Sequence, residues 1–146
     1  MPSIERIIDY AELEPEKTQG YSGFEIKEGE IVFSDVFMRY RPELAYSLQG
    51  LSFSIKPGTK LGIVGRTGAG KSTLMQVLFR LTELDQGKIY IDGQDITAHC
   101  LTDVRRQISV IQQNPFIFAA SVRSNLDPFD SCTDDELWEV LADVQL

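Results

Sequence analysis

Alternating apolar and polar positions first appear between residues 30 and 58. Two runs there are rich in β-branched and aromatic residues, IVFSDVFMRY and LSFSIKPG, and the second ends at Pro57 and Gly58. Partial alternation in runs of this length is typical of half-buried strands. We therefore predict two antiparallel strands in this part of the chain.

A strand, a glycine-rich turn and a helix are predicted from residue 60 onward. The strand is the short apolar run KLGIVG, which leads directly into the glycines. The segment after the turn is STLMQVLFRL, and its apolar residues recur at helical spacing. The residues that form this apolar face are Leu74, Val77, Leu78 and Leu81. The unit is strand, loop, helix.

Further elements follow in the second half of the chain. We predict a strand running into an Asp-Gly turn in GKIYIDGQDI, a short helix in LTDVRRQ and a strand in ISVIQQ. The next stretch, NPFIFAASVRSNLDPF, is rich in loop signals. A last helix begins at a capping box of Thr133 and Glu136. Its apolar stripe consists of Leu137, Val140, Leu141 and Val144.

Residues 1–28 differ in composition from the rest of the chain. They are rich in Glu, Lys, Gly and Ser, and we therefore predict a linker or extended arm.

With 146 residues, of which 42% are apolar, the chain has the size of one globular domain. It contains no run of about 18 apolar residues that could span a membrane, and its start does not resemble a secretory signal. Any attachment to a membrane is therefore expected to come from other segments.

Charge and metal-ligand composition exclude two classes of function. The chain has 22 acidic and 14 basic residues and a formal net charge of -8, which argues against general nucleic-acid binding. Cys100 and Cys132 lack a CxxC spacing, and His99 is a single histidine, so no zinc site is predicted. We expect both thiols to be free, in a reducing compartment.

The glycine-rich turn carries the strongest chemical signal, because it satisfies the phosphate-binding pattern GxxxxGK(S/T). Its glycines let successive backbone N–H groups point at phosphate oxygens, and the following helix aims its positive dipole end at the same place. Lys71 can reach the outer phosphates, and the hydroxyl of Ser72 can ligate Mg²⁺. The predicted nucleotide-binding residues are Gly65, Arg66, Thr67, Gly68, Ala69, Gly70, Lys71, Ser72 and Thr73.

The flanking segments resemble the ATP-binding domain of ABC transporters. Within that family the chain is most similar to the multidrug-resistance-associated (C) subfamily, particularly its second nucleotide-binding domain. The segments that carry the resemblance are FSDVFMRYRPEL, GIVGRTGAGKST, GKIYIDGQDI and RRQISVIQQNPFIFAASVRSNLDPF. The resemblance divides the chain into a linker from a membrane domain, residues 1–28, and a partial nucleotide-binding domain, residues 29–146.

The resemblance assigns roles to further residues. Tyr40 matches the aromatic residue that stacks on adenine, with Tyr46 as a nearby competitor. Gln113 matches the Q-loop glutamine that positions water and, with Ser72, Mg²⁺. Thr73 is expected on the α-phosphate. Gln112 and Asn114 stand where the family usually has proline and aspartate, so the alternative is a match shifted by one residue.

The resemblance also implies an α/β fold. We expect a P-loop NTPase core with a parallel sheet, an N-terminal antiparallel β subdomain and a truncated helical subdomain. The signature motif, the Walker B strand, the catalytic Glu and the switch histidine are not found in the sequence. We therefore expect a fragment of a larger protein that is marginally stable alone, and that binds ATP but hydrolyses it poorly.

The predicted function is the ATP-binding part of an ABC transporter that exports organic anions or drugs. The expected cofactors are ATP and Mg²⁺, and the expected location is the cytoplasmic face of a membrane. Expected partners are a second nucleotide-binding domain, arranged head to tail, and the transmembrane domains. One alternative is a regulatory domain of a channel or receptor-type relative that binds ATP without hydrolysing it. Another is a soluble P-loop kinase or GTPase, although the NKxD motif with which a GTPase reads its base is not found.

Overall fold

The computed structural model describes residues 2–13, 15–16, 18–111 and 114–146. The chain divides into two compact units, Met1–Ser109 and Val110–Leu146. Each unit is described separately below.

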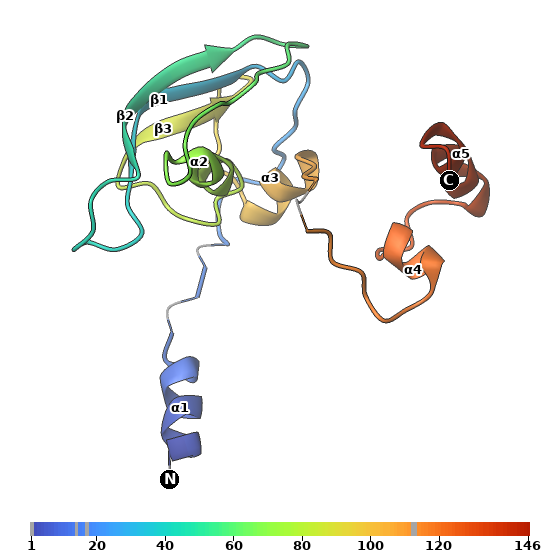
Figure 1. The fold of residues 1–146 in the computed structure, drawn as a ribbon, viewed down its shortest axis with the longest axis horizontal. Coiled ribbons are helices and arrows are strands. Elements are labelled where there is room, and N and C mark those ends of the chain that lie inside the picture. The colour runs from blue at the N-terminus through green and yellow to red at the C-terminus, as the bar shows by residue number, and fades with distance from the viewer. Residues whose placement is uncertain (1, 14, 17, 112–113) are drawn as a thin grey trace. The chain divides into compact units, whose positions relative to one another are not determined.

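The first unit is built on an antiparallel sheet of four strands in the order β2-β1-β3-β4. Figure 1 labels the three longer strands, β1, β2 and β3. The strands are β1 (Ile31–Met38), β2 (Leu48–Ile55), β3 (Gln86–Ile91) and β4 (Gln94–Asp95). Phe33 on β1 lies opposite Phe53 on β2 and Ile89 on β3, and the rings of Phe33 and Phe53 are stacked. The two predicted antiparallel strands and the strand ending in an Asp-Gly turn are therefore confirmed.

Helices α2 (Lys71–Leu78) and α3 (Leu101–Gln107) contribute to the core of the sheet unit. Val77 and Leu78 of α2 and Val104 of α3 are buried in one apolar cluster with side chains of β1 and β3. Both helices were predicted, the first from the helical spacing of its apolar residues and the second as a short helix in LTDVRRQ. The helix after the glycine-rich turn ends earlier than predicted, because Phe79 is its C-cap and Leu81 is exposed.

The start of the chain contains helix α1 (Pro2–Ala11), so this part of the predicted arm is helical. Ile4, Ile7, Ile8 and Tyr10 of this helix are exposed. Nearer to β1, Phe24 is buried in the core cluster, and Tyr21 exchanges backbone hydrogen bonds with Ala98 and Cys100. Tyr21 and Phe24 are therefore attached to the packed part of the first unit.

Two predicted strands are absent from the described part of the chain. Residues 60–65 and 108–111 have no strand pairing, and the apolar side chains of Val64 and Ile111 are 96% and 100% exposed. A strand needs a hydrogen-bonded neighbour, and both sides of β1 are already occupied by β2 and β3. The expected parallel sheet is consequently not seen among the described residues, where every strand pair is antiparallel.

The second unit contains helices α4 (Val122–Leu126) and α5 (Asp134–Asp143). The predicted capping box of Thr133 and Glu136 is confirmed, with both reciprocal hydrogen bonds present. Arg123 of α4 forms ion pairs with Asp130 and Asp134. Half of the predicted apolar stripe of α5 is uncovered, because Val140 and Val144 are exposed whereas Leu137 and Leu141 are partly buried.

Of the helices in the described ranges, none has the length and apolarity needed to cross a bilayer. Cys100 and Cys132, both of which are described, are free thiols as predicted.

Candidate functional site

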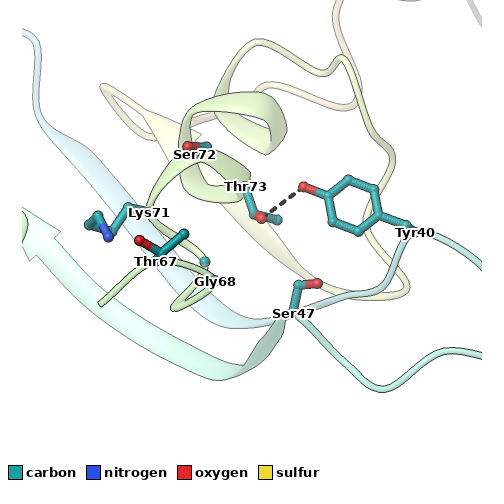
Figure 2. Close-up of a pocket in the computed structure, with 8 residues that line it drawn as sticks. Tyr40, Ser47, Thr67, Gly68, Lys71, Ser72 and Thr73 are labelled. Carbon is teal, nitrogen blue, oxygen red and sulfur yellow. Dashed lines mark hydrogen bonds between the residues drawn. The ribbon is translucent and has the colours of Figure 1, made fainter. Parts of the chain in front are cut away.

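A pocket of about 340 Å³ lies between the glycine-rich turn and the loop that connects β1 to β2. Figure 2 shows hydroxyl, ammonium and aromatic groups of both segments around it. Its lining residues are Tyr40, Ser47, Thr67, Gly68, Gly70, Lys71, Ser72 and Thr73. No carboxylate is among these described lining residues, so the pocket suits an anion. Its volume lies in the range of ligand sites.

The turn reaches its shape through glycine at the N-cap of α2. Gly70 has φ 82 and ψ 5, a left-handed conformation. A Cβ atom at this position would lie 2.9 Å from the carbonyl oxygen of Ser47, so only glycine fits. This close approach places the start of α2 directly against the β1–β2 loop. The free N–H groups of the first helical turn then face the pocket.

The Lys71 ammonium lies over the turn itself. Its Nζ donates hydrogen bonds to the carbonyl oxygens of Gly65 (2.6 Å) and Arg66 (2.7 Å). An ammonium group has three protons, so one remains for another acceptor. The side chain therefore holds the turn closed and places a positive charge at the pocket.

Tyr40 faces the start of α2 from the β1–β2 loop. Its hydroxyl lies 2.9 Å from Oγ1 of Thr73, as the dashed line in Figure 2 marks, and donates to Oε1 of Gln76 at 2.7 Å. The residue is 49% exposed, which leaves ring surface open to a ligand. The structure thus brings Tyr40 and the turn into one site. Tyr46 does not line this pocket; its ring packs against Phe37 and the Arg39 guanidinium.

The hydroxyl groups of Ser72 and Thr73 offer oxygen atoms, the type of ligand that Mg²⁺ prefers. Ser72 and Thr73 both line the pocket, Ser72 as an exposed residue and Thr73 as a buried one. Among the described residues there is no cluster of three or more His, Cys, Asp or Glu that could hold a metal. A hard cation here would therefore rely on the oxygen of Ser72 and on oxygens of the ligand, a donor set that fits Mg²⁺.

The other predicted site residues divide into two groups. Gly65, Arg66 and Ala69 belong to the turn but do not line the pocket. Gln113, the predicted Q-loop residue, lies outside the described residues. Ser47 and Gln76 were missed, because neither belongs to a recognisable motif and only the folded chain brings them to the site.

Comparison with known families and proteins gives a consistent result. The family model described as ABC transporter matches residues 48–146. The ABC-type transporter cicA of Emericella nidulans is 53% identical over 81% of this chain, and the alignment covers 8% of that protein. The oligomycin resistance ATP-dependent permease of Saccharomyces cerevisiae is 48% identical over 97% of the chain and 10% of its own length.

A third relative is the probable multidrug resistance-associated protein lethal(2)03659 of Drosophila melanogaster, which is 43% identical over 100% of the chain and 11% of its own length. Several further relatives are C family members of Dictyostelium discoideum. The chain spans about a tenth of the length of the curated relatives that it matches.

Proposed function

The chain belongs to the ABC transporter family, and on this premise we propose that it is the ATP-binding portion of an exporter for organic anions or drugs. The observation that carries the proposal is the pocket in which Tyr40 faces the glycine-rich turn with Lys71. One side of this pocket offers an aromatic ring, and the other offers amides and a cation. Adenine and a polyphosphate require these two surfaces.

Each side chain has a proposed part in holding ATP. The ring of Tyr40 stacks on adenine, the amides of residues 65–70 and the Lys71 ammonium bind the β- and γ-phosphates, and the Thr73 hydroxyl binds the α-phosphate. Ser72 holds Mg²⁺, and Gln113 is proposed to complete the site. When bound, Mg²⁺ neutralises the charge of the phosphates.

The fold of the whole domain follows from the same proposal. We propose that residues 60–65 form a strand of a parallel sheet in the complete nucleotide-binding domain. Leu61, Ile63 and Val64 are exposed, which supports this proposal. Burial of such apolar side chains stabilises a fold, and neighbouring strands of a sheet would supply that burial. Residues 1–28 would be the linker to a membrane domain.

The partners and the location are proposals of the same kind. A second nucleotide-binding domain is proposed to close head to tail over the pocket, and transmembrane domains are proposed to carry the exported compound. The chain would then lie at the cytoplasmic face of a membrane. The names of the relatives support a role in resistance to toxic compounds, since two of them refer to oligomycin resistance and multidrug resistance.

Equilibrium binding of a fluorescent ATP analogue in the presence of Mg²⁺ tests the proposal. We expect wild-type chain to bind, Lys71→Ala to abolish binding, and Tyr40→Ala to weaken it about tenfold, because base stacking contributes about 1–3 kcal/mol. Lys60→Ala, which removes an exposed lysine outside the pocket, is the matched control and should bind like wild type. Folded chain that does not bind would contradict the proposed function.

A further inference from the structure

The Tyr40 hydroxyl is tied to α2 by two hydrogen bonds. It lies 2.9 Å from Oγ1 of Thr73 and donates to Oε1 of Gln76 at 2.7 Å. Gln76 follows Thr73 by three residues on the helix, so both side chains lie on the same face, one above the other. A residue of the exposed β1–β2 loop is thereby attached to an ordered helix.

Proton counting separates the roles of the two helix residues. A tyrosine hydroxyl has one proton, and here it is donated to Gln76. The Thr73 hydroxyl must therefore donate its own single proton to Tyr40. The same proton is the one that Thr73 needs for an α-phosphate. When Thr73 turns to a phosphate, Gln76 becomes the group that still accepts from Tyr40.

The hydrogen bond from Tyr40 to Gln76 matters because ordering the Tyr40 side chain costs conformational entropy. Tyr40 is 49% exposed and sits in a loop without regular structure, so its ring would lose conformational freedom when it stacks on a base. A ring that is already held loses less, and the binding free energy is correspondingly more favourable. Gln76 itself is half-buried and carried by α2, whose neighbouring residue Val77 is buried in the core.

We infer that Gln76 is a positioning residue, which holds the hydroxyl of Tyr40 so that the ring is ready to receive adenine. This inference rests on the proposed function. Gln76 acts on the base end of the nucleotide, through Tyr40, and does not act on the phosphates. It therefore contributes to selectivity for a nucleoside triphosphate over a simple polyphosphate.

Calorimetric titration of the full chain with Mg²⁺-ATP and with Mg²⁺-tripolyphosphate tests the inference, since only ATP has a base. We expect Gln76→Leu to weaken ATP binding about threefold to tenfold, the range for loss of one hydrogen bond, and to leave tripolyphosphate binding unchanged. Tyr40→Phe keeps the ring but loses the hydroxyl, so it should have the same effect. The double variant should be no weaker than either single variant, because both changes remove one interaction.

Two controls separate positioning from a general structural role. Gln76→Glu keeps an acceptor oxygen, so the ratio of the two affinities should return to the wild-type value. Gln86→Leu makes the same substitution at an exposed position on β3, outside the pocket, and should change neither affinity.

The outcomes distinguish the inference from the proposed function. If wild type binds ATP and Gln76→Leu binds it equally well, the inference is wrong and the proposed function stands. If Gln76→Leu weakens both ligands alike, Gln76 supports the turn and does not position Tyr40, which also overturns the inference. Wild-type chain that binds neither ligand would refute the proposed function and the inference together.

Discussion

At the scale of single residues, the site depends on the particular chemistry of a glycine and a lysine in the turn. Gly70 provides a left-handed backbone with no Cβ, and Lys71 provides a cation that reaches back to the turn. Both could be predicted from the sequence, because the phosphate-binding pattern consists of residue types at fixed spacing. Ser47 and Gln76 could not, because their place in the site depends on how the β1–β2 loop meets α2.

A pair of glycine substitutions tests the packing of the turn. Gly68 and Gly70 both have φ 82, but a Cβ atom at Gly68 would meet nothing within 4 Å. Gly68→Ala should therefore lower the free energy of unfolding by about 1–2 kcal/mol, which is the cost of a left-handed backbone at a residue with a Cβ atom. Gly70→Ala should cost at least about 1 kcal/mol more, because its Cβ would overlap the carbonyl of Ser47. Urea unfolding followed by circular dichroism measures both, and equal losses would show that the turn and the β1–β2 loop are not in contact.

At the scale of elements, local signals account for the hairpins and helices of the first unit, and the missing strands show where such signals stop. The run IVFSDVFM forms β1 because β2 and β3 are available on both sides. The run KLGIVG also contains branched apolar residues, yet it remains unpaired in the described structure. An apolar run predicts that a segment is stabilised by burial. Whether the segment forms a strand also depends on a partner strand, and the run itself does not show which segment that partner is.

The turn between β3 and β4 gives a prediction about pH. The Asp92 carboxylate accepts hydrogen bonds from the backbone N–H groups of residues 27–30, at 2.7 to 3.1 Å. These bonds, first those of Glu28 and Gly29, lower the pKa of Asp92 to about 2 against the opposing effect of burial. Because the folded-state pKa is lowered, the stabilisation is complete above the unfolded-state pKa and is lost as the pH falls toward the folded-state pKa.

We therefore expect Asp92→Asn to lower the free energy of unfolding at neutral pH and to have a progressively smaller effect between about pH 4 and pH 2. The measurement is urea unfolding at a series of pH values. Asp9→Asn, which changes an exposed carboxylate on α1, should have no comparable effect. A destabilisation by Asp92→Asn that does not diminish in acid would contradict this account.

The C-terminal end of α2 depends on Arg105 of α3. Its guanidinium donates to the carbonyl oxygens of Phe79 (3.0 Å) and Arg80 (2.9 Å), which follow the last helical residue, and pairs with the Glu16 carboxylate at 2.7 Å. Helix ends need such donors. Arg105→Ala should therefore lower the free energy of unfolding by about 1–3 kcal/mol.

Glu16→Ala provides the comparison for Arg105→Ala. It removes only the partly exposed ion pair and leaves the carbonyl contacts in place, so it should have a much smaller effect. Thermal or urea unfolding of the two variants gives the difference directly. If Glu16→Ala cost as much as Arg105→Ala, the ion pair and not the carbonyl contacts would be the main stabilising interaction.

At the scale of the whole molecule, the chain is two compact units that each leave apolar surface exposed. Leu61 and Ile63 in the first unit and Phe129 and Trp138 in the second are all more than 40% exposed. The chain corresponds to about a tenth of its relatives' length. Family membership could be predicted from the order and spacing of several motifs. The predicted parallel sheet is not seen among the described residues, because the run at residues 60–65 has no neighbouring strand there to pair with.

Hydrogen exchange with and without Mg²⁺-ATP tests the central claim most directly, because it shows where the nucleotide binds. We predict that ATP slows exchange of the backbone amides in residues 65–73 and of the loop carrying Tyr40, leaves the β3–β4 turn unchanged, and has no effect on Lys71→Ala. Unchanged exchange in residues 65–73 of wild-type chain at saturating ATP, or protection confined to other segments, would contradict the assignment of this turn as an ATP site.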